Sequence, residues 1–314
     1  MALPYQAVLL IAFGGPTRPE EIRPFLARVT EGLPIPPQRL EEVAHHYEAV
    51  GGRSPLNEIT ERQAHALGKL FNDHNQPLPV FVGMRNSNPF FAETLKQMRS
   101  AGITRALGFI LSSHRTEASW ERYQKNIADA RAGLGATAPE VDYCEGWHDH
   151  PLFIQCWAEL ISSAFARIAS EQRNSTPLIF TAHSLPAAMA ARSHYVDEVQ
   201  TTARLIANSL SHERWTLAYQ SRSGRPSDPW LEPDIGQMIR DFAARSVKDV
   251  VVAPIGFVCD HVEVLYDLDI ETKTLAAGFG MNFVRASCPN DHPTFIRMMA
   301  SVIEERIRKV EDRG

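Results

Sequence analysis

Residues 250–271 read VVVAPIGFVCDHVEVLYDLDIE, an uncharged apolar run followed by a row of acids. The apolar part is typical of a strand in a parallel sheet, because both faces of such a strand are covered. The acidic part has helical spacing, with Glu263, Asp267 and Glu271 at i, i+4 and i+8 on one face. Parallel sheets place ligand sites at the carboxyl ends of their strands. The stretch therefore predicts an α/β fold with a candidate site here.

The acidic row is unusual because like charges four residues apart in a helix repel each other. No Lys or Arg interrupts the row before Lys273. A solvated helix face is one interpretation of such a row. However, the apolar Val262, Val264 and Leu265 share the same turns and indicate a half-buried helix. We therefore interpret the row as a path for cations or protons.

The rest of the chain repeats this alternation of apolar runs and amphipathic segments, which indicates parallel sheets covered by helices. We expect strands at 7–13, 79–84, 106–111, 177–182, 215–220, 249–255 and 281–286. We expect helices at 19–29, 38–50, 59–74, 89–101, 118–134, 151–169, 196–209, 234–244, 262–277 and 293–308. The polar segment 168–176 separates two similar halves. We therefore predict an N-terminal α/β lobe at 1–170 and a C-terminal α/β lobe at 171–314, whose last helix can pack back on the first lobe.

Composition narrows the class of protein. The 314 residues are 44% hydrophobic and 22% charged, with a net charge of −5, which argues against a nucleic-acid partner. There is no apolar window long enough to span a membrane, and the N-terminus does not resemble a signal peptide. Four scattered cysteines without a CxxC pair fit reduced thiols. We expect a cytoplasmic monomer without a transmembrane segment.

Three predicted strands end near a histidine: His114, His183 and His261. One such histidine is usually structural, but three at strand ends indicate a ligand site. His183 precedes Leu185-Pro186, where the proline restricts the backbone and stiffens the turn. Proton transfer and metal ligation are both open to it. Together with Glu263 it would form a His/carboxylate site suited to ferrous iron, and two ligands suit transfer of a metal better than storage.

Two glycine-rich loops follow predicted elements, Gly14-Gly15 and Gly51-Gly52. A phosphate cradle is one reading of the first, but neither a GxGxxG nor a Walker pattern is present. We prefer close approach of a flat ligand to the backbone.

A later loop holds further candidates for ligand binding. Arg222 and Arg225 can bind carboxylates or stay solvated, and Trp230 can be a stacking wall or a packed anchor.

Together these residues resemble the ferrochelatase family, which inserts ferrous iron into a porphyrin in haem synthesis. The resemblance runs in order along nearly the whole chain. Its motifs are Gly14-Gly15-Pro16, Tyr47 through Gly51-Gly52-Arg53-Ser54-Pro55, Thr181-Ala182-His183-Ser184-Leu185-Pro186, Gln220-Ser221, Asp228-Pro229-Trp230-Leu231, and Pro254-Ile255-Gly256-Phe257 into the acidic row.

The resemblance implies the type II chelatase fold, two doubly wound flavodoxin-like lobes with parallel sheets and a porphyrin cleft between them. It implies catalytic and metal-binding roles for His183 and Glu263, and a proton or metal path through Asp267 and Glu271. Whether His183 is chiefly base or ligand is left open. The porphyrin-binding residues that it implies are Phe13, Tyr47, Ser54, Arg85, Tyr123 and Trp230.

The chain departs from the family pattern in three places. Phe13 stands where a tyrosine able to ligate iron can occur in members that use coproporphyrin III. Thr30 and His46 stand where arginines can bind propionates, so Arg28, His45 or Arg53 are the substitutes. Cys156 matches a cluster ligand of some members, but no cysteine follows Cys288. We therefore expect no iron–sulfur cluster and no other cofactor, with ferrous iron as a substrate.

The segment between Pro16 and Gly51 is short and lacks the longer apolar lip of the membrane-associated members of the family. The resemblance therefore favours coproporphyrin III over protoporphyrin IX as the substrate. Two alternatives remain at this point. A carrier of tetrapyrrole or metal would keep the binding site without turnover, although it has no use for the acidic row. A cobalt- or nickel-inserting chelatase of related fold would typically show additional histidines.

Overall fold

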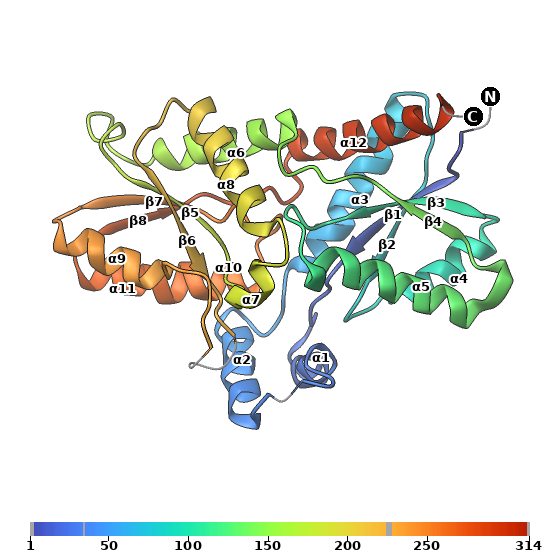
Figure 1. Cartoon of the computed structure of the whole chain (residues 1–314), viewed down its shortest axis with the longest axis horizontal. Coiled ribbons are helices and arrows are strands. Elements are labelled where there is room, and N and C mark those ends of the chain that lie inside the picture. The colour runs from blue at the N-terminus through green and yellow to red at the C-terminus, as the bar shows by residue number, and fades with distance from the viewer. Residues whose placement is uncertain (1–2, 34, 224–227, 313–314) are drawn as a thin grey trace. The chain divides into compact units, whose positions relative to one another are not determined.

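A computed structural model describes residues 3–33, 35–223 and 228–312 (Figure 1). It contains two four-stranded parallel sheets, with strand orders β2-β1-β3-β4 and β6-β5-β7-β8. Each sheet has its helices on both faces, so the predicted α/β class with two doubly wound parallel sheets is confirmed. No helix in these ranges is both long and apolar enough to cross a membrane.

The first sheet consists of β1 (Ala7–Ala12), β2 (Val80–Met84), β3 (Arg105–Ile110) and β4 (Glu140–Tyr143). All six residues of β1 are buried, as expected for a central strand. The sequence analysis missed β4. It is an edge strand with two acids and one aliphatic residue, so hydrophobic pattern does not mark it.

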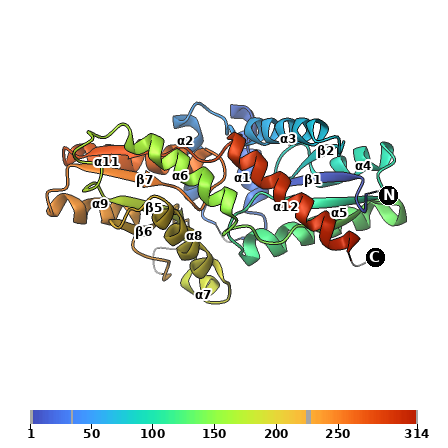
Figure 2. The same cartoon turned by 90° about the horizontal axis from the view of Figure 1, so that it is seen from above.

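The helices of this sheet begin with a 3₁₀ turn and include one π-helix. They are η1 (Pro19–Glu21), α1 (Ile22–Val29), α2 (Pro37–Ala49), α3 (Leu56–Asp73), α4 (Phe91–Ser100), η2 (Glu117–Glu121), α5 (Arg122–Leu134), the 3₁₀ turn η3 (Gly135–Thr137) and α12 (Pro293–Glu311). α4 packs on α5, and α12 packs on α3 and β3 (Figure 2). Apolar residues of α4, α5, β1 and β3 form one buried cluster.

The second sheet consists of β5 (Leu178–His183), β6 (Trp215–Gln220), β7 (Asp249–Ala253) and β8 (Asn282–Arg285). Its helices are α6 (Pro151–Phe165), α7 (Ala187–Ala190), α8 (Tyr195–Ser209), α9 (Ile235–Ala244), α10 (Val262–Val264), the π-helix η4 (Leu265–Thr272) and α11 (Lys273–Gly278). α6 packs on α8, and α9 packs on α11. All seven strands predicted from sequence are present.

The chain divides into two compact units, and the division differs from the predicted boundary at 170/171. One unit holds Met1–Ser112, Glu117–Trp147 and Asp291–Gly314, and the other holds Ser113–Thr116 and His148–Asn290. The helix that follows β4, α6, contacts β7, β8 and α8 and so belongs to the second unit. Conversely, α12 follows β8 and belongs to the first unit. Each half thus gives its last helix to the other.

The two sheets show the same internal plan. In each, the first strand of the half lies beside the third, and a π-helix lies between that third strand and the next strand of the chain: η2 after β3, and η4 after β7 and α10. Strand order reverses between these two strands, and this is the place where open α/β sheets bind ligands. The plan therefore marks the carboxyl ends of β5 and β7 as the candidate site of the second unit.

Candidate functional site

The structure brings His183 and Glu263 together at this point of the second sheet. His183 is the last residue of β5, and Glu263 lies in α10, which follows β7. The distance between His183 Nε2 and Glu263 Oε1 is 3.8 Å, and the two side chains are 29% and 42% exposed. Both groups are therefore close together and open to a ligand. The sequence analysis proposed this pair.

Close packing of the β7 loop on β5 makes the pairing possible. The backbone N–H of Gly256 donates to the carbonyl of Thr181 at 3.0 Å. A Cβ on Gly256 would lie 2.7 Å from Cα of Ala182, a distance that backbone atoms cannot accommodate. A glycine is needed here because any side chain would push the loop, and with it Glu263, away from His183.

The hydrogen bonds of His183 define which ring nitrogen faces the pair. Nδ1 lies 2.5 Å from the carbonyl oxygen of Ser184, and a carbonyl can only accept, so Nδ1 carries a proton. In the neutral ring the lone pair is then on Nε2, the atom nearest Glu263. The hydroxyl of Tyr195 donates to the His183 carbonyl at 2.9 Å and holds the backbone. His183 can thus accept a proton or bind a metal at Nε2.

His261 lies beside the pair but has a different task. Its Nδ1 accepts the backbone N–H of Glu263 at 3.2 Å, which caps α10. Burial lowers the pKa of His261, and the neighbouring His183 lowers it further, against the opposing charge of Glu263. Its ring centroid lies 5.0 Å from that of Phe257. His261 is therefore a neutral residue that orients the start of the helix.

The third strand-end histidine, His114, is buried and has a structural role. It is 2% exposed, and its ring nitrogens lie 3.0 Å from the hydroxyls of Ser113 and Thr202. Burial lowers its pKa to about 3, so it stays neutral. The position at the end of a strand therefore does not by itself distinguish a buried structural histidine such as His114 from a candidate site residue such as His183.

The acidic row begins in α10 with Glu263 and continues on a π-helix with Asp267 and Glu271, which corrects the predicted regular helix at 262–277. After the single turn of α10, residues 265–272 form η4. A π-helix has a wider turn than an α-helix, so residues four apart stay on one side of it. Asp267 is half-buried and accepts a hydrogen bond from Ser221 Oγ, whereas Glu271 is exposed. The row therefore runs from the His183–Glu263 pair towards solvent.

Within the described ranges no three His, Cys, Asp or Glu side chains are grouped so that they could hold a metal ion. The His183–Glu263 pair alone provides two protein ligands. Divalent transition metals usually have more protein ligands than this when they are held permanently.

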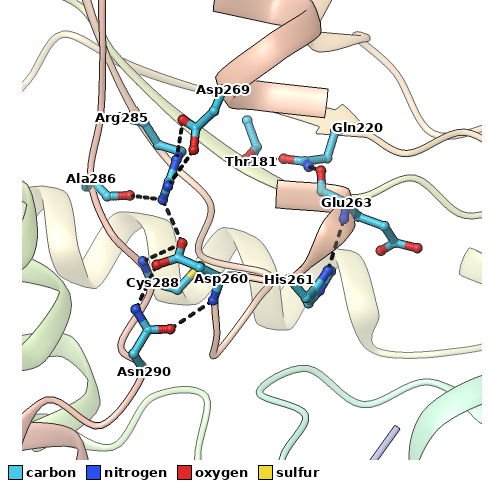
Figure 3. A network of polar contacts seen from close by, with 10 residues as sticks. All are labelled: Thr181, Gln220, Asp260, His261, Glu263, Asp269, Arg285, Ala286, Cys288 and Asn290. Carbon is cyan, nitrogen blue, oxygen red and sulfur yellow. Dashed lines mark hydrogen bonds and ion pairs between the residues drawn. The ribbon is translucent and has the colours of Figure 1, made fainter. Parts of the chain in front are cut away.

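An ion-pair network fixes the loop before α10 and the π-helix after it, on either side of Glu263 (Figure 3). Arg285, at the end of β8, donates to both oxygens of Asp269 at 2.7 Å and to Asp260 at 2.7 Å. Asn290 Nδ2 donates to Asp260 at 2.7 Å, and Asp260 N donates back to Asn290 Oδ1 at 2.8 Å. The Arg285 side chain is only 12% exposed. One guanidinium therefore ties the loop before His261 to the π-helix.

We expect Arg285→Leu to lower the free energy of unfolding by about 3 kcal/mol or more, because it leaves two partly buried carboxylates unpaired. Arg105→Leu is the matched control. Its partner Asp142 is 37% exposed and Arg105 42%, so this change should cost only about 1 kcal/mol or less. Urea denaturation of both variants checks the difference. Equal losses would show that the network adds no more than a surface pair.

The first unit contains five of the predicted porphyrin-binding residues. Phe13 is 36% exposed and Arg85 is half-buried. By contrast, Tyr47, Ser54 and Tyr123 are each 6% exposed and contribute mainly to packing. Tyr47 stacks edge-on against Phe25, which does the same with Phe13. Of these residues, Phe13 and Arg85 present the most surface to a ligand.

The glycines of the first loop pack closely against other residues of the protein. A Cβ on Gly14, whose φ is 82°, would meet Ser87 Oγ at 2.3 Å, and one on Gly15 would meet Cβ of Ser54 at 2.6 Å. Gly15 N also donates to Asn57 Oδ1 at 2.8 Å. The loop therefore needs glycine to accommodate the protein's own side chains.

Arg85 is the distinctive charge of this region. Burial lowers its pKa, its guanidinium lies 6.0 Å from the Phe13 ring centroid, and in the described part of the chain no carboxylate pairs with it. Arg28 donates to the carbonyl of Asn86, the next residue, at 3.1 Å. Of the other predicted substitutes, His45 pairs with Glu48 and Arg53 is exposed. The Arg28 guanidinium lies 5.7 Å from the ring centroid of Phe90, so each of the two cations has an aromatic ring of its own. Cations next to aromatic rings suit an anionic, flat ligand.

Trp230 belongs to the second unit and is half-buried. It forms a bridge with Pro186, three residues after His183, and the Arg222 guanidinium lies 5.9 Å from its ring centroid. Trp230 thus anchors the loop after His183. Arg225, proposed with Arg222 as a carboxylate ligand, lies outside the described residues.

Comparison with known proteins identifies the family of the chain. A family model for ferrochelatase matches residues 5–307. The chain is 39% identical over 311 residues to the ferrochelatase of Rhodopirellula baltica, covering 99% of this chain and 88% of that protein. It is 42% identical over 305 residues to the coproporphyrin III ferrochelatase of Mycobacteroides abscessus, covering 96% and 88%. In fold alone it is similar to SirB from Bacillus subtilis with Fe3+, with a TM-score of 0.62, 10% identity and 98% of both chains covered. The chain belongs to the ferrochelatase family.

Proposed function

We propose that this ferrochelatase inserts ferrous iron into coproporphyrin III. The observation that carries the proposal is the His183–Glu263 pair, with Nε2 and Oε1 3.8 Å apart at a sheet end where α/β proteins bind ligands. Iron entry requires the porphyrin to release its inner N–H protons. If His183 acts as the base, its Nε2 accepts one proton and Glu263 accepts the other. If His183 hands over iron instead, Glu263 accepts one proton and the next carboxylate of the row, Asp267, accepts the second. Asp267 and Glu271 then lead charge away along η4.

Arg85 supports coproporphyrin III as the porphyrin. This substrate carries propionates where protoporphyrin IX carries vinyl groups. A half-buried guanidinium that has no protein carboxylate gains most from a ligand carboxylate, because a charge-assisted hydrogen bond contributes about 1.5–3 kcal/mol. Two relatives, in Mycobacteroides abscessus and Mycolicibacterium smegmatis, are named coproporphyrin III ferrochelatase, the second 39% identical over 312 residues.

The absence of an iron–sulfur cluster is part of the proposal. All four cysteines are buried, and none of them forms a disulfide bond. Burial raises the pKa of Cys144, Cys259 and Cys288, which disfavours the thiolates that a cluster requires. Cysteines without disulfide bonds also fit the reducing cytoplasm, where we place the enzyme. The monomeric state stays a prediction from the sequence.

Anaerobic turnover with ferrous iron tests the proposal. We expect kcat/KM for coproporphyrin III to exceed that for protoporphyrin IX by about tenfold or more. Arg85→Met should remove most of that preference by raising KM for coproporphyrin III. Arg99→Met is the control, because Arg99 is exposed and donates to Thr137. Preference for protoporphyrin IX would refute the choice of substrate.

The same assay separates the alternatives. A carrier would bind porphyrin, which quenches its fluorescence, without forming a metalloporphyrin. A cobalt- or nickel-inserting enzyme would act on those ions faster than on ferrous iron. Either result would refute iron insertion as the function of this chain.

A further inference from the structure

Gln220, the last residue of β6, contacts both sides of the His183–Glu263 pair. It lies opposite His183 in the β5–β6 register, and its carbonyl accepts the backbone N–H of Ser184 at 2.7 Å. Its side-chain Nε2 donates to the backbone carbonyl of Glu263 at 3.0 Å. The residue is 1% exposed. Gln220 therefore connects the strand that carries the histidine to the helix that carries the acid.

Thr181 determines how the Gln220 amide is oriented. Its hydroxyl donates to Gln220 Oε1 at 2.7 Å, and a glutamine oxygen cannot donate. The oxygen of the amide therefore faces Thr181, and its NH₂ group faces Glu263 (Figure 3). Thr181 is itself fully buried, and its carbonyl accepts from Gly256. The same threonine thus holds both the β7 loop and the amide that reaches the helix.

Ser221 extends the connection to the second acid of the row. In an extended strand, consecutive side chains point to opposite faces. Ser221 instead has φ of 62°, in the left-handed region, and the chain turns there. Its hydroxyl donates to Asp267 while Gln220 holds Glu263. Two consecutive residues therefore hold two acids one helical turn apart.

We propose that Gln220, oriented by Thr181, is a positioning residue that sets the distance between His183 Nε2 and the Glu263 carboxylate. Ser221 likewise holds the Asp267 carboxylate in place. The inference rests on the proposed function, because it assigns the pair to turnover. The competing explanation is that these buried polar groups merely satisfy one another. The two differ in what a substitution changes: positioning affects kcat, whereas mutual satisfaction affects only stability.

The experiment measures kcat, KM for coproporphyrin III and unfolding midpoint for three variants. Gln220→Met keeps the side-chain length but removes the amide, and Thr181→Val removes the hydroxyl that orients it. Both should lower kcat by roughly tenfold or more, because small misplacements of reacting groups are costly, with KM nearly unchanged. Thr181→Ser keeps the hydroxyl and should recover most of the rate even if it is as unstable as the valine variant.

Thr94→Val is the matched control, because Thr94 is fully buried and its hydroxyl donates to the Val82 carbonyl in the other unit. It should lose stability without losing kcat. Near-normal kcat in Gln220→Met and Thr181→Val would overturn the inference, and so would a serine variant as slow as valine. If Gln220→Met does not fold, the comparison of kcat between Thr181→Val and Thr181→Ser still tests the inference. Wild-type protein that forms no haem product would instead refute the proposed function.

Discussion

His183→Ala should stop iron insertion while the protein still binds porphyrin. Removing a positioned proton acceptor commonly lowers the rate by about a hundredfold or more. Binding should persist because a flat macrocycle is held mainly by apolar and aromatic surface, such as Phe13, rather than by one imidazole. Anaerobic turnover gives kcat, and quenching of porphyrin fluorescence gives the dissociation constant separately.

His74→Ala is the control for loss of a histidine. His74 lies at the end of α3 and pairs with Glu304, with its side chain 50% exposed. It should keep the wild-type rate. If His183→Ala retained more than about a tenth of wild-type kcat, a loss below 1.4 kcal/mol, His183 would have no place in the reaction.

The second large effect concerns the acidic row, where the three amide variants should differ in order. Glu263→Gln should lower kcat by about a hundredfold, because it removes a proton acceptor beside His183 Nε2. Asp267→Asn and Glu271→Gln should have smaller effects, because they only weaken the attraction of the row for cations. They should raise KM for iron by about threefold to tenfold, and this increase should become smaller at high salt concentration.

The control is Glu58→Gln, on the exposed face of α3, where Glu58 pairs with Arg62. It should leave kcat and KM for iron unchanged. Steady-state kinetics at low and high ionic strength compare all four variants. Equal, near-normal rates for the three row variants would mean that η4 is only a scaffold with a solvated acidic face.

Local sequence was sufficient for most of the secondary structure. The seven predicted strands are present because apolar runs bounded by turn residues mark buried parallel strands independently of their partners. The exception is β4, whose Glu140 and Asp142 lie at an edge, where pairing with β3 rather than apolar content makes the strand. The pair His183 and Glu263 could also be predicted from the sequence, since both residues come at or after the ends of predicted strands.

What the sequence by itself determined was therefore the α/β class, the order of its elements and the residues that end at the candidate site, because hydrophobic periodicity and turn chemistry act over short distances. Only the tertiary structure decided which half receives α6 and α12, since a helix packs on whichever sheet covers its apolar face. It alone turned residues 265–272 into a π-helix and separated the neutral, buried His114 from His183. It also placed Gln220 between β5 and Glu263, because that contact depends on strand register and on packing across 43 residues.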